Sequence, residues 1–428
     1  MAAIQQHTQG TSSMKLNDAD TEKRLVDAIL KSPADRAPFI DLAEYLENTG
    51  RLEDSKTVYR GMLPVSIQDQ HKLDPHPRSA SRDIPLCTRL CSYSEEIYPL
   101  QPPVNVDEKR NSIFHNQQIS VPAEYIDLME NCTLLYDGKN RLYLDSQGIR
   151  NSDHSTMNGY LLMPKSLSVK SSTHLEGVSV LLAAHNSHNF YHWHFDLMPC
   201  LSLIEASGIS LSEVDHFLVD QNNSGFQTRI LKAAGVSEHQ IQYIDVKQCH
   251  VTCEKMIMWR TYNSQGMSQS HRHLDWMRRT FLKKINVLSS DVSRTPERIA
   301  VKRTVRGFTN ADEVYKKLER KGYYCVLLEE LPYHEQVALF ANARQVVAPH
   351  GAGLTLLAYC KPGTVVHEFY ADHVQPCFWS LASALNLEYH NYNCSDVTDK
   401  ALSSSNKNLG KRLAKTIDVT MHQIDCLP

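Results

Sequence analysis

The sequence predicts an α/β protein with two Rossmann-like domains that face a cleft, preceded by a small α-helical hairpin. From residue 132 onward, apolar strand patterns alternate with helical patterns, and this alternation is interrupted once, at 289–297. A separate helical stretch precedes both series. Strands that alternate with helices form mostly parallel sheets, in which ligands bind beyond the carboxyl ends of the strands.

We divide the chain into five parts on these patterns. They are a helical N-terminal segment (1–65), an irregular connection with weak strands (66–130), a first Rossmann-like domain (131–290), a second Rossmann-like domain (297–400), and a C-terminal helix and tail (401–428).

The N-terminal segment is predicted to be one helix-turn-helix unit of the tetratricopeptide type. Leu42, Ala43 and Leu46 share a helical face, and Gly50 breaks the helix before a second helix that carries Tyr59. Such a unit spans about 34 residues and cannot bury both of its faces alone. We therefore expect it to dock on the rest of the chain, with binding of a protein partner as the alternative.

The first domain begins with a hairpin at 133–145 that turns at Asp137-Gly138. The expected elements that follow are a strand at 177–185, an amphipathic helix over 188–209, a strand at 214–220, a helix at 225–235, strands at 241–246 and 251–259, and a long helix at 271–288.

The second domain repeats the alternation after the linker at 289–297. Its expected elements are strands at 298–303, 323–329, 345–351, 364–370 and 388–393, helices at 310–322, 332–343 and 377–387, a short helix after 353, and a last basic helix at about 406–417.

The composition bounds the class of protein. The chain has 428 residues and a formal net charge of −3, which disfavours a dedicated nucleic-acid binder. No apolar run approaches the roughly 20 residues of a membrane span, and the N-terminus lacks the apolar stretch of a secretory signal. We expect a cytoplasmic or membrane-peripheral protein, or a secretory-pathway protein if an N-terminal anchor is missing from this chain.

The stretch "APHGAGLTLLAYCKPGTVVHEF" (348–369) carries the strongest functional signal. A buried strand ends there in a bend with His350, Gly351, Ala352 and Gly353, and a helix starts near Leu354. Glycines there allow unusual backbone conformations and close approach of a ligand, and a helix N-terminus binds anions. The bend therefore predicts a diphosphate site, to which His350 adds a donor.

Charged residues at adjoining strand ends strengthen this prediction. Lys302, Arg303 and Arg306 follow another strand of the same domain, and Glu368 ends the next one, where it could accept hydrogen bonds from ribose hydroxyls. Glycines that only allow tight packing are the alternative, since a G-x-G pair is weak by itself. An esterase is excluded because the HGGG-like bend has no G-x-S-x-G partner.

These motifs together resemble glycosyltransferase family 61. The resemblance rests on "HNFYHWHFDLMP" (188–199), "VKRTVRGFTNADEV" (301–314) and the stretch at 348–369, and it covers about residues 130–395. Lys302, Ala311 and Leu356 depart from the residues common at these positions.

The resemblance implies a GT-B fold and an inverting, metal-independent transfer from a nucleotide-sugar, usually a UDP-sugar. It places the nucleotide in the second domain and leaves the first domain for the acceptor, a glycan, polysaccharide or protein-linked hydroxyl. No cofactor is expected beyond the nucleotide-sugar co-substrate, and no nucleic acid partner is expected.

Inverting transfer needs a base that takes the proton of the acceptor hydroxyl. His192 and Asp196 are four residues apart on one helix face, and we assign the catalytic role to this pair without choosing between them. His188, Asn189 and Tyr191 are candidate acceptor contacts. The alternative is that this aromatic segment is core, with its histidines satisfied internally.

A group of cysteines and histidines and a basic helix face are each expected to have a structural role. Cys249, Cys253 and the histidines at 271 and 273 lack the spacing of a zinc site, so no metal is expected. Arg278 and its basic neighbours are expected to form a solvated helix face. Two alternatives to an enzyme stay open: a non-catalytic nucleotide-sugar or glycan binder with a helical docking arm, and an α/β scaffold without a nucleotide site.

Overall fold

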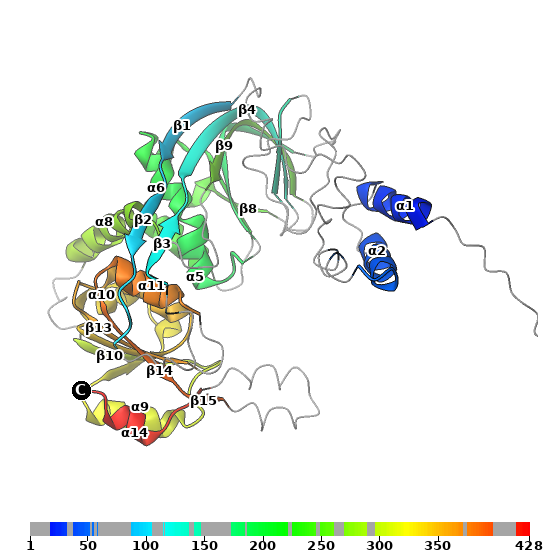
Figure 1. The fold of residues 1–428 in the computed structure, drawn as a ribbon. Helices are drawn as coiled ribbons and strands as arrows, with labels where there is room; N and C mark the ends of the chain where they lie inside the picture. Colours follow the sequence, from blue (N-terminus) through cyan, green and yellow to red (C-terminus); the bar gives the residue numbers. More distant parts are fainter. Residues whose placement is uncertain are drawn as a thin grey trace, which may run out of the picture.

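The computed structural model confirms the mixed α/β class. It describes residues 18–31, 37–51, 54, 58, 87–104, 114, 116–136, 141–146, 173–184, 186–220, 225–244, 249–260, 269–288, 296–370, 375–396 and 417–428. A seven-stranded sheet and a five-stranded sheet form the centres of two halves. Figure 1 shows the larger sheet above the smaller one, with α8, α10 and α11 between them.

Two N-terminal helices pack on each other, away from the sheets in Figure 1. Helix α1 (Asp18–Lys31) and helix α2 (Ala37–Asn48) bury Val26 and Ile29 against Leu42 and Leu46. Gly50 follows α2 with a φ of 81°, as expected of a residue that ends a helix. Most of the second helix predicted beyond Gly50 lies outside the described residues, so the tetratricopeptide reading stays a prediction.

The larger sheet is mixed, where a mostly parallel sheet was expected. Its strand order is β1-β4-β9-β6-β7-β8, with β5 beside β4. The strands are β1 (Cys87–Tyr93), β4 (Glu124–Tyr136), β5 (Arg141–Leu144), β6 (Thr173–Leu182), β7 (His216–Asp220), β8 (Ile241–Ile244) and β9 (Cys249–Arg260). The strands from β9 to β8 are parallel, whereas β4 is antiparallel to β1, β5 and β9.

The strands expected within the connection at 66–130 occur in its second half, where they are more regular than expected. Strand β1 and the first part of β4 belong to the larger sheet, and β2 (Glu96–Pro99) pairs with β3 (Gln118–Val121). Beyond β2 the chain lies on the smaller-sheet half, where Trp379 donates from Nε1 to the carbonyl of Gln101 at 2.6 Å. The hairpin of β4 and β5 is confirmed, although its turn at 137–140 lies outside the described residues.

The helix expected at 188–209 consists of three short helices. Helix α5 (Phe190–His192) continues into the π-helix η2 (Trp193–Leu197), and α6 (Pro199–Ala206) follows with Pro199 at its first position. The other helices of this half are η3 (Leu211–Glu213), α7 (Phe226–Ala234), η4 (Glu238–Gln240) and α8 (His271–Leu288).

The smaller sheet is parallel and has the order β11-β10-β12-β13-β14. Its strands are β10 (Arg298–Val301), β11 (Tyr324–Val326), β12 (Gln345–Pro349), β13 (Val365–Tyr370) and β14 (Glu388–Asn393). Its helices are α9 (Ala311–Arg320), η7 (Leu328–Glu330), α10 (Tyr333–Asn342), η8 (Ala352–Tyr359) and α11 (Cys377–Ala384). Taken in chain order this is a doubly wound 2-1-3-4-5 sheet.

The C-terminal helix predicted at about 406–417 lies almost entirely outside the described residues. At its end, Ile417 belongs to β16 (Ile417–Asp418), which pairs with β15 (Ser395–Asp396). A short helix, α14 (Met421–Asp425), follows and packs on α9.

Candidate active site

Both halves place their sequence motifs at a change in the direction of strand order. In the smaller sheet this point lies between β10 and β12, so Arg303 and His350 follow the two strands that flank it. In the larger sheet it lies between β6 and β9, and α5 follows β6. Such points are where doubly wound sheets bind ligands. Helices α5 and α8 of the larger-sheet half pack against η8, so the two motifs meet at one interface.

His192 and Asp196 form a hydrogen-bonded pair at this interface. His192 Nδ1 lies 2.6 Å from Asp196 Oδ2, and each side chain keeps 31% of its surface exposed. His192 is the last residue of α5 and Asp196 lies in η2, so the π turn forms the backbone between the two paired residues. Isolated π turns occur frequently at functional sites. The ring nitrogen Nε2 of His192 is left to accept a proton.

His194 anchors η2 to the smaller-sheet half. Its Nδ1 donates to the carbonyl of Phe190 at 2.7 Å, and its Nε2 accepts from the hydroxyl of Tyr333 at 3.0 Å. Burial lowers the pKa of His194 to about 4, so the ring stays neutral at neutral pH and this tautomer is self-consistent. His194 is therefore a structural histidine, as the core alternative predicted for part of this segment.

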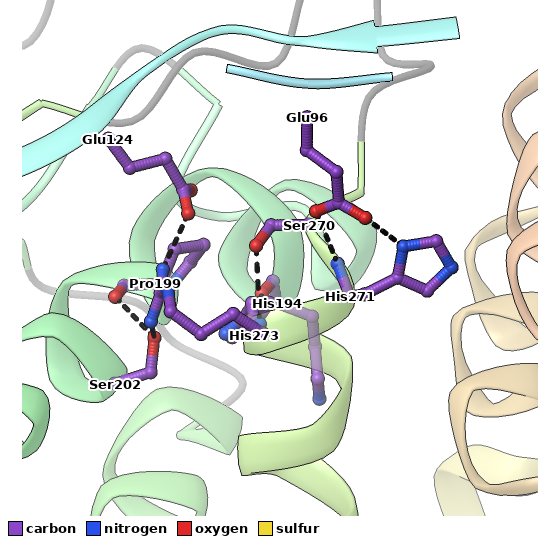
Figure 2. Close-up of polar contacts among 9 residues, drawn as sticks. Glu96, Glu124, His194, Pro199, Ser202, Ser270, His271 and His273 are labelled. Carbon is purple, nitrogen blue, oxygen red and sulfur yellow. Dashed lines mark hydrogen bonds and ion pairs between the residues drawn. The ribbon is translucent and has the colours of Figure 1, made fainter. Parts of the chain in front are cut away.

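Helix α8 holds the π turn from the other side, as Figure 2 shows. His273 Nε2 donates to the carbonyl of His194 at 2.8 Å, and burial lowers the pKa of His273 to about 3. Figure 2 also shows Glu96 bonded to the ring and the backbone N–H of His271. These bonds fix the first turn of α8 and, through His273, the π turn.

Arg303 crosses the HGAG bend. Its Nη1 donates to the carbonyl of His350. A Cβ at Gly351 would lie 2.8 Å from Nε of Arg303 and closer still to Nη1. The φ of Gly351 is 166°, which is extended backbone, so the expected need for an unusual conformation was wrong. Gly351 is needed because the guanidinium occupies the space of a side chain. Gly353 likewise has no positive φ, and a Cβ there would lie 3.0 Å from Leu328 Cδ1.

Arg303, beside the N-terminus of η8, and its neighbour Arg306 form a cationic pair. Burial and the charge of Arg306 lower the pKa of Arg303 below its ordinary value. Within the described part of the chain, no carboxylate forms an ion pair with either guanidinium. Arg306 has a φ of 60°, a conformation that costs a non-glycine residue roughly 1–2 kcal/mol. Glu329 is the nearby carboxylate that acts on Arg303, but it does not approach to ion-pair distance. Two guanidiniums without an ion-pair partner among the described residues, one of them at a strained backbone position, fit an anion site.

His350 is paired with Glu368 beneath it. Nδ1 of His350 lies 2.6 Å from Oε1 of Glu368, and the Glu368 side chain is 0% exposed. The expectation that Glu368 accepts hydrogen bonds from a ribose was therefore wrong, because no part of this carboxylate reaches solvent. The His350 side chain is 20% exposed and stacks on Tyr370, with ring centroids 5.0 Å apart.

Helix α11 connects the two pairs. The ring of Phe378 lies 5.5 Å from the ring of Tyr191, which precedes His192, and 5.5 Å from the ring of His350. Two residues further along α11, Ser380 donates to Gln269 at 2.9 Å, and Gln269 in turn donates to the hydroxyl of Tyr191 at 2.8 Å. The His192 and His350 motifs, far apart in the sequence, are thus held by one buried helix.

A family model described as Glycosyltransferase 61 matches residues 190–367. The chain carries a glycosyltransferase 61 domain. The match begins at the first residue of α5 and ends in β13, so it spans both motifs and the interface between them. Among curated proteins, none is detectably similar to this chain. In the part of the chain that the structure describes, no helix is long and apolar enough to cross a membrane.

The three candidate acceptor contacts, which lie at or just before the start of the glycosyltransferase 61 match, differ in exposure. His188 is exposed. Asn189 caps α5 by accepting from the backbone N–H of Tyr191 at 2.9 Å. Tyr191 is buried, and its hydroxyl is bonded to Gln269. The structure thus gives Asn189 and Tyr191 roles within the protein and leaves His188 as the accessible member.

Two residues near the site were missed from the sequence. Gly307 lies behind Arg303, where a Cβ would be 2.6 Å from the Arg303 carbonyl. Asp220 ends β7 and accepts from the hydroxyl of Ser187, and burial raises its pKa. Its position at the end of a parallel strand was a signal that could have pointed to it.

Three polar residues of the glycosyltransferase 61 domain make contacts within the protein that differ from their expected roles. Lys302 pairs with Glu319 of α9 at 3.9 Å. Arg278 donates to the carbonyls of Ala358 and Cys360, so it fastens η8 and does not belong to a solvated face. Asn310 precedes α9 but makes no capping bond and donates instead to the carbonyl of Val419.

Among the described residues, no group of three His, Cys, Asp or Glu side chains could hold a metal ion.

Proposed function

We propose that this protein transfers a sugar from a nucleoside diphosphate donor, a UDP-sugar by preference, to a hydroxyl of a glycan, polysaccharide or protein-linked acceptor. The observation that carries the proposal is the cationic loop at the β10–β12 switch point. Arg303 and Arg306 have no ion-pair partner in the described part of the chain, and Arg303 lies against the bend that leads into η8, whose first N–H groups lack partners within the helix. A diphosphate matches this charge and these donors.

The chemistry divides between the two halves. The acceptor oxygen attacks the anomeric carbon as its proton passes to His192 Nε2, with Asp196 orienting the ring, or to Asp196 itself. The bond between that carbon and the diphosphate oxygen breaks on the opposite side, so the configuration inverts. The electron pair leaves with the diphosphate, and Arg303, Arg306 and His350 stabilise the charge that develops there.

A GT-B-like arrangement and metal-independent transfer belong to the same proposal. Two α/β halves that each turn a switch point toward a shared interface support the first. The two guanidiniums support the second, because they supply the positive charge that the departing diphosphate needs. Cytoplasmic location and a protein partner for the N-terminal helices remain predictions from the sequence alone.

The test is release of UDP from a panel of UDP-sugars by the purified chain, in EDTA, with glycan acceptors present. Turnover that falls at least 100-fold in His192→Gln, while UDP still binds, supports the enzyme, since a general base contributes about 10²- to 10⁴-fold. Nucleotide binding without turnover by the wild type on any donor tried would favour the non-catalytic binder.

A further inference from the structure

Glu368 is a buried carboxylate surrounded by donors. Its Oε1 faces Nδ1 of His350 at 2.6 Å. Its Oε2 lies 2.9 Å from the hydroxyl of Tyr370 and 2.6 Å from the hydroxyl of Tyr389. Burial and the charge of Glu368 raise the pKa of both tyrosines well above the ordinary value, so both hydroxyls keep their protons as donors.

This arrangement determines how His350 is protonated. Tyr389 donates to Oε2, while the single hydroxyl proton of Tyr370 is shared among Oε2, the carbonyl of Gln375 at 3.0 Å and the hydroxyl of Tyr389 at 2.8 Å. With Oε2 occupied by the tyrosines, the carboxylate accepts from the His350 ring through Oε1, so Nδ1 carries a proton. The other ring nitrogen, Nε2, has no hydrogen-bond partner within the described residues. The ring edge that carries Nε2 is the part of the dyad left for a ligand, because Glu368 itself is fully buried.

We propose that Glu368 is a positioning residue that fixes the Nδ1–H form of His350, so that binding of a diphosphate draws a solvent proton onto Nε2. This inference rests on the proposed function for its ligand. A neutral ring in this form presents a lone pair at Nε2, which cannot donate to a phosphate oxygen. A proton taken up at Nε2 supplies the donor and a positive charge together.

The charged and titratable groups around His350 allow the uptake to be assigned to its ring. Arg303 packs over the bend that contains His350, and Arg306 is its neighbour in the same loop. Guanidiniums do not lose their protons in proteins, so neither arginine takes up a proton. Tyr370 and Tyr389 stay protonated. Cys377 of α11 lies near Glu368, and burial raises the pKa of its thiol well above the ordinary value. The His350 ring is therefore the group expected to gain a proton near pH 8.

Glu368→Gln is predicted to reverse the tautomer. The hydroxyl of Tyr389 needs an acceptor at this position, so it holds the amide oxygen on its side and turns the amide NH₂ toward His350. Nδ1 must then accept, which places the ring proton on Nε2. The variant ring already carries a donor at Nε2, so it can bind a phosphate oxygen without taking up a proton.

The experiment is calorimetric titration of UDP into the protein at pH 8, in two buffers of different ionisation enthalpy. Free imidazole is largely neutral at this pH. We expect wild type to take up a proton, up to about one per UDP bound, and Glu368→Gln and His350→Gln to take up little or none. Tyr389→Phe, which keeps the carboxylate, should retain the uptake. Equal uptake in wild type and Glu368→Gln would overturn the inference.

A second measurement tests the pairing without nucleotide. In ¹⁵N-histidine spectra of the ligand-free protein, assigned by comparison with His350→Gln, the neutral ring should carry its proton on Nδ1 in wild type and on Nε2 in Glu368→Gln. A proton on Nε2 in wild type would overturn the inference even if UDP binds. If no nucleotide binds but the spectra agree, the proposed function fails and the pairing stands.

Discussion

The guanidinium of Arg303 lies over Gly351, in the space that a side chain at 351 would fill. The relationship explains why a glycine stands at a backbone conformation open to any residue. It also makes the HGAG bend and the β10 loop one unit, since Arg303 donates to the carbonyl of His350.

Gly351→Ala is expected to displace Arg303 and weaken nucleotide binding about 10- to 100-fold, the range of one charged hydrogen bond. Calorimetry with UDP measures the change. Gly353→Ala is the matched control, because its Cβ would meet only a leucine side chain at 3.0 Å and a valine at 3.4 Å. Equal losses in both variants would show that the Arg303 contact does not matter.

Arg306→Asn should weaken UDP binding while leaving the protein at least as stable. Arg306 holds a φ of 60°, which asparagine tolerates better than arginine, and its side chain is free of ion pairs in the described part of the chain. Thermal unfolding and UDP titration of the same preparation report both quantities. A lower melting temperature would contradict the view that the loop is strained for binding.

Asp196→Asn should lower kcat and leave the affinity for UDP nearly unchanged. The pair with His192 lies on the larger-sheet half, whereas the predicted diphosphate contacts lie on the smaller one. Steady-state kinetics with the donor found in the screen, together with UDP calorimetry, separate the two effects. His239→Gln, at an exposed position in η4 of the same half, serves as control. A large loss of UDP affinity in Asp196→Asn would contradict the assignment of the pair to the acceptor side.

Acid should destabilise the protein below about pH 6.5. Burial lowers the pKa of His194 to about 4 and of His273 and His367 to about 3, all below the unfolded value of about 6.5. The unfolded chain therefore binds these protons first, so stability is full above pH 6.5 and declines as pH falls toward the folded pKa values. Each histidine contributes up to about 1.4 kcal/mol per pH unit.

Denaturant unfolding between pH 7.5 and 5 measures this slope. His367→Leu should make the decline shallower, because Nε2 of His367 is buried without a partner among the described residues and its replacement removes one titrating group. A free energy of unfolding that stays constant or rises from pH 7.5 to 5 would contradict the account.

The smaller sheet could be predicted almost strand by strand. Strands β10, β12 and β13 are short, mostly apolar runs buried on both faces, and Gly or Pro residues lie near their ends. Strand β1 could not be predicted in this way, because none of its seven residues is fully buried, its burial does not alternate, and its place depends on pairing with β4. Long-range pairing of that kind is not encoded in a local pattern.

The site was predictable in its residues and less so in their roles. The spacing of His192 and Asp196 on one face was enough to foresee their pairing, which the structure confirms at 2.6 Å. The π turn was not foreseeable, since it depends on a bond from His273, distant in sequence. The role of Glu368 also depends on distant partners: only the fold brings Tyr389 to the carboxylate and hides it from a ligand.

The central claim is that the β10–β12 switch point binds a nucleoside diphosphate through Arg303. The most direct test is calorimetric titration of UDP, GDP and CMP into the purified chain in EDTA, with Arg303→Ala as control. We predict tight binding of one nucleoside diphosphate, UDP by preference, which persists in EDTA and is lost in the variant. A well-folded wild type that binds none of the three, or a variant that binds as well as wild type, would contradict it.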